Sequence, residues 1–232
     1  MRMIITIDGP SGAGKSTVGF KLARILGYRY IDSGALYRIV ALEAKKNGIN
    51  EKEEEQLANL AKNLKVNFLN ENGKIKVFNY NQDVSELIRS PEISMLASRI
   101  SALKSVREEI TAWQRRMGNN GDLVLEGRDA GTVVFPDAPI KFFLDATSEV
   151  RGKRRFNELK LKGLPVSLEQ ITQEIKKRDH NDRTRCYAPL KPAPDAVIID
   201  SSNLTVEEVI ARMMTFIHEK KLGGKIKWKK MK

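Results

Sequence analysis

A run of small and charged residues near the N-terminus has the composition of a loop that binds phosphate groups. It reads Gly9-Pro10-Ser11-Gly12-Ala13-Gly14-Lys15-Ser16-Thr17. Glycines permit backbone angles that turn successive N–H groups inward, where a helix dipole also favours an anion. Lys15 would reach the β- and γ-phosphates of ATP, and the Ser16 hydroxyl would help to hold Mg²⁺. The run therefore predicts ATP binding over residues 9–17, with Ser16 as a metal ligand.

Arginines recur in three further segments that also contain Gly, Asp or Ser. These segments are Asp32-Ser33-Gly34-Ala35-Leu36-Tyr37-Arg38, residues 126–134 and residues 178–185. A phosphate loop alone does not separate kinases from GTPases or motor ATPases. We find no elements that would read a guanine base, and a large ATPase would usually need a longer chain with a clear second acidic motif. A short chain with many arginines favours phosphoryl transfer between two small molecules.

The elements around these segments alternate between strand and helix patterns, which is typical of a parallel sheet with crossover helices. Residues 3–8 have the apolar run of a buried strand, and a helix pattern follows from about 15 to 26. A tight strand-to-helix connection that needs glycine is the simpler explanation of the loop, and the complete motif argues against it. Other expected elements are strands at 123–125, 140–144 and 196–199, a hairpin around Asn72-Gly73, and helix starts at Ser90-Pro91, at Ser105 with Glu108 and at Thr205 with Glu208.

Composition limits the class of protein. A chain of 232 residues with 41% hydrophobic residues can form one substantial core or a core with a small inserted domain. No apolar run approaches the roughly 20 residues that span a bilayer, and the N-terminus lacks the pattern of a secretory signal. Cys186 is the single cysteine, so it has no partner for an internal disulfide, and with two histidines it makes no credible zinc cluster. We expect a cytoplasmic protein.

The net charge of +12 would favour a polyanionic partner if it formed one surface. Part of it lies in the lysine-rich tail at 220–232, and part in arginines between 151 and 185, where phosphate groups on a small substrate would explain it equally well. A nucleic-acid-binding regulator that uses ATP as a switch is therefore an alternative. We expect no nucleic-acid partner and a monomer, with the tail a solubilising extension and a nucleic-acid contact its alternative.

The phosphate loop and the three arginine-bearing segments, in this order, closely resemble the bacterial-type cytidylate kinase family. The resemblance covers residues 4 to about 214 and implies transfer of the γ-phosphoryl group of ATP to CMP or dCMP. It implies an α/β fold: a parallel-sheet P-loop NTPase core with helices on both faces, a small inserted acceptor-binding domain and a helical lid. The expected ranges are 1–50, 91–150 and 186–222 for the core, 51–90 for the insertion, 151–185 for the lid and 223–232 for a basic tail.

The resemblance also implies roles for single residues. Its cytosine-reading positions match Ser98, Arg107 and Asp129. The positions that line the acceptor pocket match Ser33 and Tyr37, the phosphate-binding arginines match Arg38, Arg128, Arg178 and Arg185, and the sugar-binding aspartate matches Asp182. Lys15, Arg128, Arg178 and Arg185 are the expected catalytic residues. Arg151, Arg154 and Arg155 fall on the helix that begins the lid, and Arg154 is expected to bind ATP.

Several of these residues have plainer alternatives. The arginines would form a solvated basic face if they did not meet a nucleotide. Ser98 and Arg107 lie in ordinary helical sequence, where a surface role is common, and Asp182 could pair with a neighbouring arginine instead of a sugar. Glu126 ends the strand before Gly127, yet the sequence places no acidic residue as a magnesium ligand, and coordination through water is as consistent as a direct contact. A kinase for another small phosphate acceptor is the nearest alternative enzyme.

Overall fold

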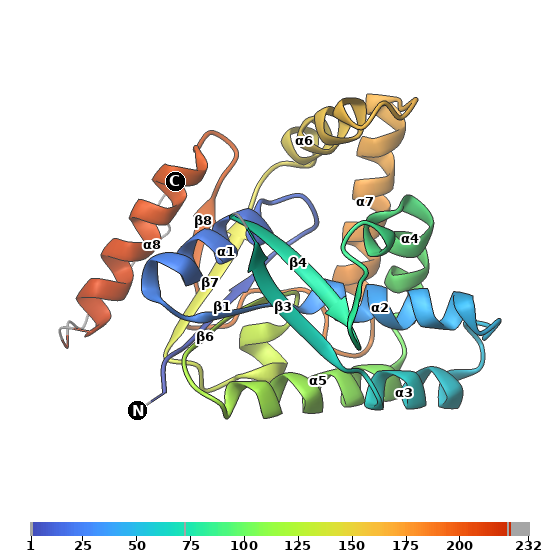
Figure 1. Cartoon of the computed structure of the whole chain (residues 1–232). Helices are drawn as coiled ribbons and strands as arrows, with labels where there is room; N and C mark the ends of the chain where they lie inside the picture. The colour runs from blue at the N-terminus through green and yellow to red at the C-terminus, as the bar shows by residue number, and fades with distance from the viewer. Residues whose placement is uncertain (1, 72, 222, 224–232) are drawn as a thin grey trace. The chain divides into compact units, whose positions relative to one another are not determined.

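The structure is a computed structural model that describes residues 2–71, 73–221 and 223. It contains two compact units: a first unit formed by Met1–Arg29 with Leu123–Lys232, and a second unit formed by Tyr30–Asp122. Figure 1 labels most of the helices and strands of both. No helix within the described ranges has both the length and the apolar character that crossing a membrane requires. Of the predicted basic tail, all but Gly223 lies outside the described residues.

The first unit is built on parallel strands. They are β1 (Ile4–Asp8), β6 (Leu123–Gly127), β7 (Ile140–Asp145) and β8 (Val197–Asp200). They lie in the order β6-β1-β7-β8, and each neighbouring pair is parallel. The residues of β1, β6 and β7 are almost all buried, as the continuous apolar runs indicate, whereas β8 has only Ile199 buried. The predicted α/β class with a parallel sheet is confirmed.

The register of these strands brings their polar ends together. Asp8, the last residue of β1, pairs with Gly127, and Ile7 pairs with Glu126 of β6. Because parallel strands all end at the same edge of a sheet, the phosphate loop after β1 and the arginine-bearing segment after β6 leave that edge side by side. The fold of this unit therefore places two of the predicted segments next to each other.

Four helices and one short turn complete the described part of the first unit. They are α1 (Lys15–Leu26), η2 (Ala130–Val134), α6 (Ser148–Leu161), α7 (Leu168–Thr184) and α8 (Val206–Lys221). The predicted capping box of α8 is confirmed, since the Thr205 hydroxyl accepts from the Glu208 N–H and the Glu208 carboxylate accepts from the Thr205 N–H. Helices α6 and α7 pack through an apolar cluster of Leu159, Ile171 and Ile175. Helix α1 lies beside α8 (Figure 1).

The second unit combines helices with a small antiparallel sheet. Its elements are the end of β2 (Arg29–Asp32), α2 (Ser33–Lys46), α3 (Glu54–Lys62), β3 (Val66–Glu71), β4 (Lys74–Asn79), β5 (Gln82–Asp83), η1 (Leu87–Arg89), α4 (Pro91–Ile100) and α5 (Lys104–Gly118). The sheet has the order β3-β4-β5. Strands β3 and β4 are antiparallel with Glu71 opposite Lys74, as a hairpin requires. Asn72, in the predicted turn, lies outside the described residues.

Two predicted helix starts in the second unit have different outcomes. Ser90 caps α4 by accepting a hydrogen bond from the Ile93 N–H, with Pro91 in the first turn, as predicted. The capping box predicted at Ser105 is wrong. With Ser105 as the cap, the helix would begin at Val106. Helix α5 begins two residues earlier, at Lys104, and the Ser105 hydroxyl donates to Glu54 of α3 instead of capping its own helix.

Candidate active site

The phosphate loop has the backbone that the glycine pattern predicts. Gly14 adopts the left-handed conformation, with φ of 95°, directly before α1 begins at Lys15. A glycine at this position has no side chain to occupy the N–H groups of the first helical turn, which have no partner within the helix itself. The buried Lys15 ammonium lies over the loop and donates to the Pro10 carbonyl at 2.7 Å. Exposed Ser16 and Thr17 follow in the first turn. This arrangement suits the phosphates of a nucleotide.

Glu126 at the end of β6 faces the start of α1. The Ser16 hydroxyl donates to Glu126 Oε1 at 2.5 Å, and Glu126 is only 3% exposed. Oxygen ligands of this kind suit Mg²⁺, which usually takes one or two carboxylates together with substrate phosphates. Within the described residues no group of three or more His, Cys, Asp or Glu could hold a metal ion by itself. The donor set at Ser16 therefore fits a magnesium ion that is held jointly with phosphates.

Asp8 ties the end of β1 to the segment that follows β6. Its carboxylate accepts hydrogen bonds from the N–H groups of Ala130 and Gly131, at 2.8 and 2.7 Å. Burial raises the pKa of Asp8 to about 7, and Asp129 adds to the rise, while the two backbone donors and Lys15 oppose it. This carboxylate holds η2, and with it the preceding Asp129, against the strand that leads into the phosphate loop. The sequence interpretation missed Asp8, because an aspartate at a strand end shows nothing of its partner.

A second cluster in the first unit is centred on Asp182 of α7. Arg128 Nε donates to Asp182 Oδ2 at 2.9 Å, and Arg185 Nη1 lies 3.7 Å from Asp182 Oδ1. Burial alone would raise the pKa of Asp182, but Arg128, Arg178 and Arg185 together hold it below its usual value. Arg185 Nη2 also lies 3.9 Å from Asp129 Oδ1, and Arg178 Nη1 is 3.4 Å from Ser11 Oγ of the phosphate loop. The structure thus brings the three predicted catalytic arginines together beside that loop.

The remaining predicted acceptor residues lie in the second unit. Arg107 is 2% exposed and its guanidinium carbon lies 5.4 Å from the centroid of the Tyr37 ring, so the surface alternative for Arg107 is wrong. Arg38 Nη1 lies 3.6 Å from Oδ2 of Asp32, the residue that caps the start of α2. Ser98 is half-buried on α4.

Ser33 has a partner that the sequence interpretation missed. Gln114 of α5, 1% exposed, donates to the Ser33 hydroxyl at 2.7 Å. A buried glutamine on an amphipathic helix carries no sequence signal for the residue that it contacts, 81 positions away. Gln114 therefore fixes the orientation of a predicted pocket residue from within the same unit.

The arginines of α6 differ in their surroundings. Arg154 donates to the side chain and the carbonyl of Ser201, and the Ser201 hydroxyl donates to Ala13 of the phosphate loop. Arg155 pairs with Glu158 on the surface at 2.7 Å, in keeping with a solvated face. Arg151 is buried.

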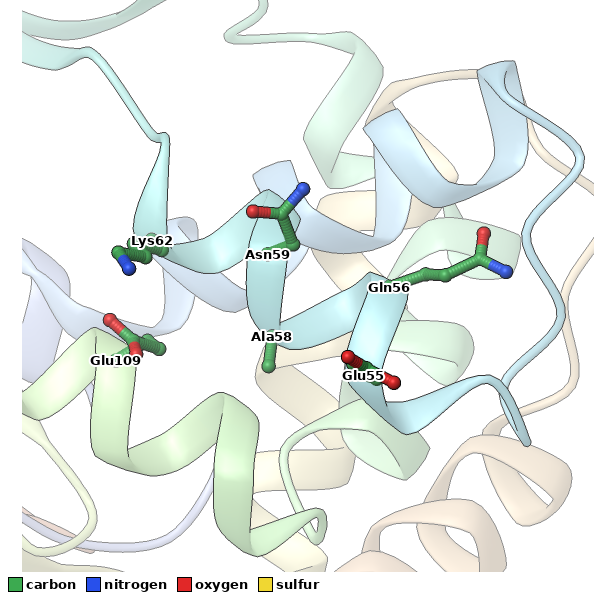
Figure 2. A pocket seen from close by; sticks show the side chains of 6 residues that line it. All are labelled: Glu55, Gln56, Ala58, Asn59, Lys62 and Glu109. Atoms are coloured by element: carbon green, nitrogen blue, oxygen red, sulfur yellow. The ribbon is translucent and has the colours of Figure 1, made fainter.

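The second unit also has a surface hollow with a different set of lining residues. It is lined by Glu55, Gln56, Ala58, Asn59 and Lys62 of α3 and by Glu109 of α5 (Figure 2). None of these lining residues belongs to the predicted site. The hollow therefore adds nothing to the site described above.

Comparison with known proteins places the chain in a family. The model of the family described as cytidylate kinase matches residues 5–219. A cytidylate kinase of Syntrophotalea carbinolica is 48% identical over 219 residues, covering 94% of this chain and 93% of the relative. One from Geobacter sulfurreducens is 49% identical over 218 residues, covering 94% of each. A solved structure of an uncharacterised protein from Eubacterium ventriosum shares the fold alone, with a TM-score of 0.54, 14% identity and coverage of 94% and 99%. The chain belongs to the cytidylate kinase family.

Proposed function

We propose that this chain transfers the γ-phosphoryl group of ATP to CMP or dCMP, giving ADP and CDP or dCDP. The observation that carries the proposal, within this family, is the joining of the phosphate loop and the arginine cluster in one unit. Arg178 reaches Ser11 of the loop, and Asp182 gathers Arg128 and Arg185 beside it. Cations placed there can stabilise the charge that spreads over a phosphoryl group in transfer.

The acceptor needs no general base. A phosphate monoester has a second pKa near 6, so at neutral pH it already carries a nucleophilic oxygen. Catalysis is then alignment and charge compensation: the loop N–H groups and Lys15 hold the donor, and Arg128, Arg178 and Arg185 stabilise the transferring group. This accounts for a site built from arginines, lysine and backbone amides.

Magnesium belongs to the proposal as cofactor. Ser16 and Glu126 would hold it with the nucleotide phosphates, Ser16 through its hydroxyl and Glu126 through the carboxylate that accepts from Ser16. The ion would neutralise charge on the donor phosphates. Support for this assignment is the buried Glu126 carboxylate at the end of β6, which accepts from Ser16 in the first turn of α1.

Cytosine recognition is proposed for Asp129, Arg107 and Ser98. A carboxylate at Asp129 can accept from the exocyclic amino group, whereas Arg107 and Ser98 can donate to the ring nitrogen and carbonyl. Uracil reverses part of that pattern, so these three groups would favour cytosine over uracil. Burial of Arg107 beside Tyr37 supports its role, because a guanidinium held in place there costs less to order around a base. Ser33, Tyr37, Arg38 and Asp182 are proposed to complete the acceptor site.

A panel of acceptors tests the function. ADP release coupled to a reporter reaction is measured with CMP, dCMP, UMP and AMP for the native chain, for Asp129→Ala and for the control Asp137→Ala, which alters an exposed aspartate further along the chain. We expect CMP and dCMP to lead, and Asp129→Ala to lose about 1 to 3 kcal/mol of preference for CMP over UMP, as for one base-edge contact. Preference of the native chain for AMP or UMP would reject the assignment, and unchanged discrimination in Asp129→Ala would remove that residue from it.

The other parts of the interpretation stay predictions. They are a cytoplasmic location, a monomer, a lid over 151–185, an insertion over 51–90, ATP binding by Arg154 and Thr17, and no nucleic-acid partner. The second unit, Tyr30–Asp122, is wider than the predicted insertion and includes α2, α4 and α5.

A further inference from the structure

Arg151 of α6 has its guanidinium buried among three segments of the first unit. The residue is 3% exposed. Its Nε donates to the Ala146 carbonyl at 2.8 Å, after β7, and its Nη1 donates to the Ser11 carbonyl of the phosphate loop at 3.0 Å. Nη1 and Nη2 also donate to the two oxygens of Asp179 on α7, at 3.1 and 2.5 Å. One side chain therefore joins the phosphate loop to α7.

Ser11 is approached from two consecutive residues of α7. Arg178 reaches its hydroxyl directly, at 3.4 Å. Asp179 reaches its carbonyl through the guanidinium of Arg151. Two contacts to one loop residue fix both the distance and the rotation of this part of α7 against the loop. The position of Arg178 over the loop therefore depends on the Arg151–Asp179 pair.

The pair is suited to this role because it is buried and bidentate. The side chains of Arg151 and Asp179 are only 4% and 13% exposed. A two-pronged guanidinium–carboxylate contact adds geometric specificity that a lysine cannot reproduce. Loss of either partner of this buried pair leaves the charge of the other partner uncompensated, so the remaining side chain and the segment that carries it must rearrange.

We propose that Arg151 and Asp179 are positioning residues for phosphoryl transfer, which fix the Arg178 guanidinium relative to the phosphate loop. Neither residue is proposed to touch a reactant. The inference rests on the proposed function, in which Arg178 stabilises the transferring group. Arg151 thereby differs in its proposed role from Arg154, which is expected to bind ATP, and from Arg155, which pairs with Glu158.

The chain offers a matched control for the packing of the two helices. Lys176 of α7 and Glu149 of α6 form a 2.9 Å ion pair between the same helices. Its side chains are 57% and 65% exposed. A variant at Glu149 therefore weakens a link between α6 and α7 without altering the contact to Ser11.

The test compares Asp179→Asn with Glu149→Gln. Steady-state kinetics with ATP and CMP are measured well below the unfolding temperature of each variant. For Asp179→Asn we expect kcat to fall about 10-fold or more, since misplacing a catalytic group by about 1 Å costs up to about 100-fold. Both KM values should stay within about threefold of native, because a group that acts only in the transition state affects kcat. Glu149→Gln should keep native kinetics.

Native kcat in Asp179→Asn, an equal loss in Glu149→Gln, or a rise in KM for ATP without a fall in kcat would each overturn the proposal. If Asp179→Asn does not fold, Arg151→Lys replaces it, because it keeps the charge but loses the fork. The same kinetic split is expected from that variant.

Hydrogen exchange separates this inference from the proposed function. Exchange of the peptide covering residues 9–17 is measured without nucleotide in both variants. We expect faster exchange in Asp179→Asn and native exchange in Glu149→Gln. Native exchange in Asp179→Asn would refute the coupling. Failure of the proposed function would instead appear as a native chain that releases no ADP with CMP or dCMP.

Discussion

At the scale of single residues, Asp8 is the buried carboxylate whose ionisation should most affect stability. Its pKa in the folded chain is about 7, against an ordinary value of 3.8. Between these values the folded state binds more protons than the unfolded state, so the stability that Asp8 contributes is complete below about pH 4 and is lost as the pH rises to 7. The loss is on the order of 4 kcal/mol.

Asp8→Asn should remove this pH dependence. The amide does not ionise, so the free energy of unfolding of the variant should fall less steeply than that of the native chain between pH 4 and pH 7. Urea unfolding at several pH values measures both slopes. Asp137→Asn, at an exposed carboxylate, is a control that should keep the native slope. Parallel native and Asp8→Asn curves would contradict a raised pKa.

Charged residues were the most predictable part of the site, and their partners the least. The glycine pattern predicted the backbone around Lys15, because glycine and lysine spacing directly reflects loop geometry. The carboxylate that meets Ser16 is 110 positions away, at Glu126. Such pairs depend on strand order, here β6 beside β1, and no local pattern encodes that order. Asp182 was predicted with two possible partners, an arginine or a sugar, and in the structure it pairs with Arg128.

At the scale of elements, the phosphate loop depends on a close approach between β1 and β7. A Cβ added at Gly9 would lie 2.0 Å from the Leu144 carbonyl oxygen of β7. That is far inside van der Waals contact, and the obstacle is backbone, which cannot rotate away. Glycine is therefore needed at position 9 because β1 and β7 lie so close together there, as well as for its own backbone angles.

Gly9→Ala should therefore destabilise the chain and weaken ATP binding together. We expect the free energy of unfolding to fall by about 1 to 3 kcal/mol, as for overpacked interiors, or more. Urea unfolding measures stability, and calorimetry with a non-hydrolysable ATP analogue measures binding. Val133→Ala, a partly buried residue of η2, serves as a control that shortens a side chain without forcing strands apart. Native stability and binding in Gly9→Ala would show that β1 and β7 can separate freely.

Elements with strong local signals were predicted well. Thr205 with Glu208 and Ser90 with Pro91 begin helices, because each cap uses only neighbouring residues. The capping box predicted at Ser105 was wrong because the Ser105 hydroxyl donates a hydrogen bond to a carboxylate distant in sequence, Glu54. Neighbouring residues thus predicted a helix start correctly where the capping side chain bonded within its own helix, and wrongly where it bonded to another helix.

At the scale of the whole molecule, part of the net charge of +12 comes from lysines in the tail at 223–232, which has no role in the proposed reaction. The predicted site residues lie between Gly9 and Arg185, well before residue 223. Removal of residues 223–232 should leave kcat/KM for CMP within about twofold of native, since changes away from the site are usually small. Coupled ADP release measures this, and addition of RNA or DNA to either chain should not raise ATP turnover. A large loss on truncation, or stimulation by nucleic acid with steep salt dependence, would favour the regulator alternative.

The carboxylate of Asp182 acts as a built-in counterion for Arg128, Arg178 and Arg185. Three guanidiniums so close together would repel one another, and a shared anion offsets that repulsion while the protein folds. The trio can therefore assemble before any nucleotide arrives, and the two carboxylates of Asp182 and Asp129 against three cations leave surplus positive charge. This surplus positive charge attracts phosphate, and folding has already set the orientation of the three guanidinium groups that carry it.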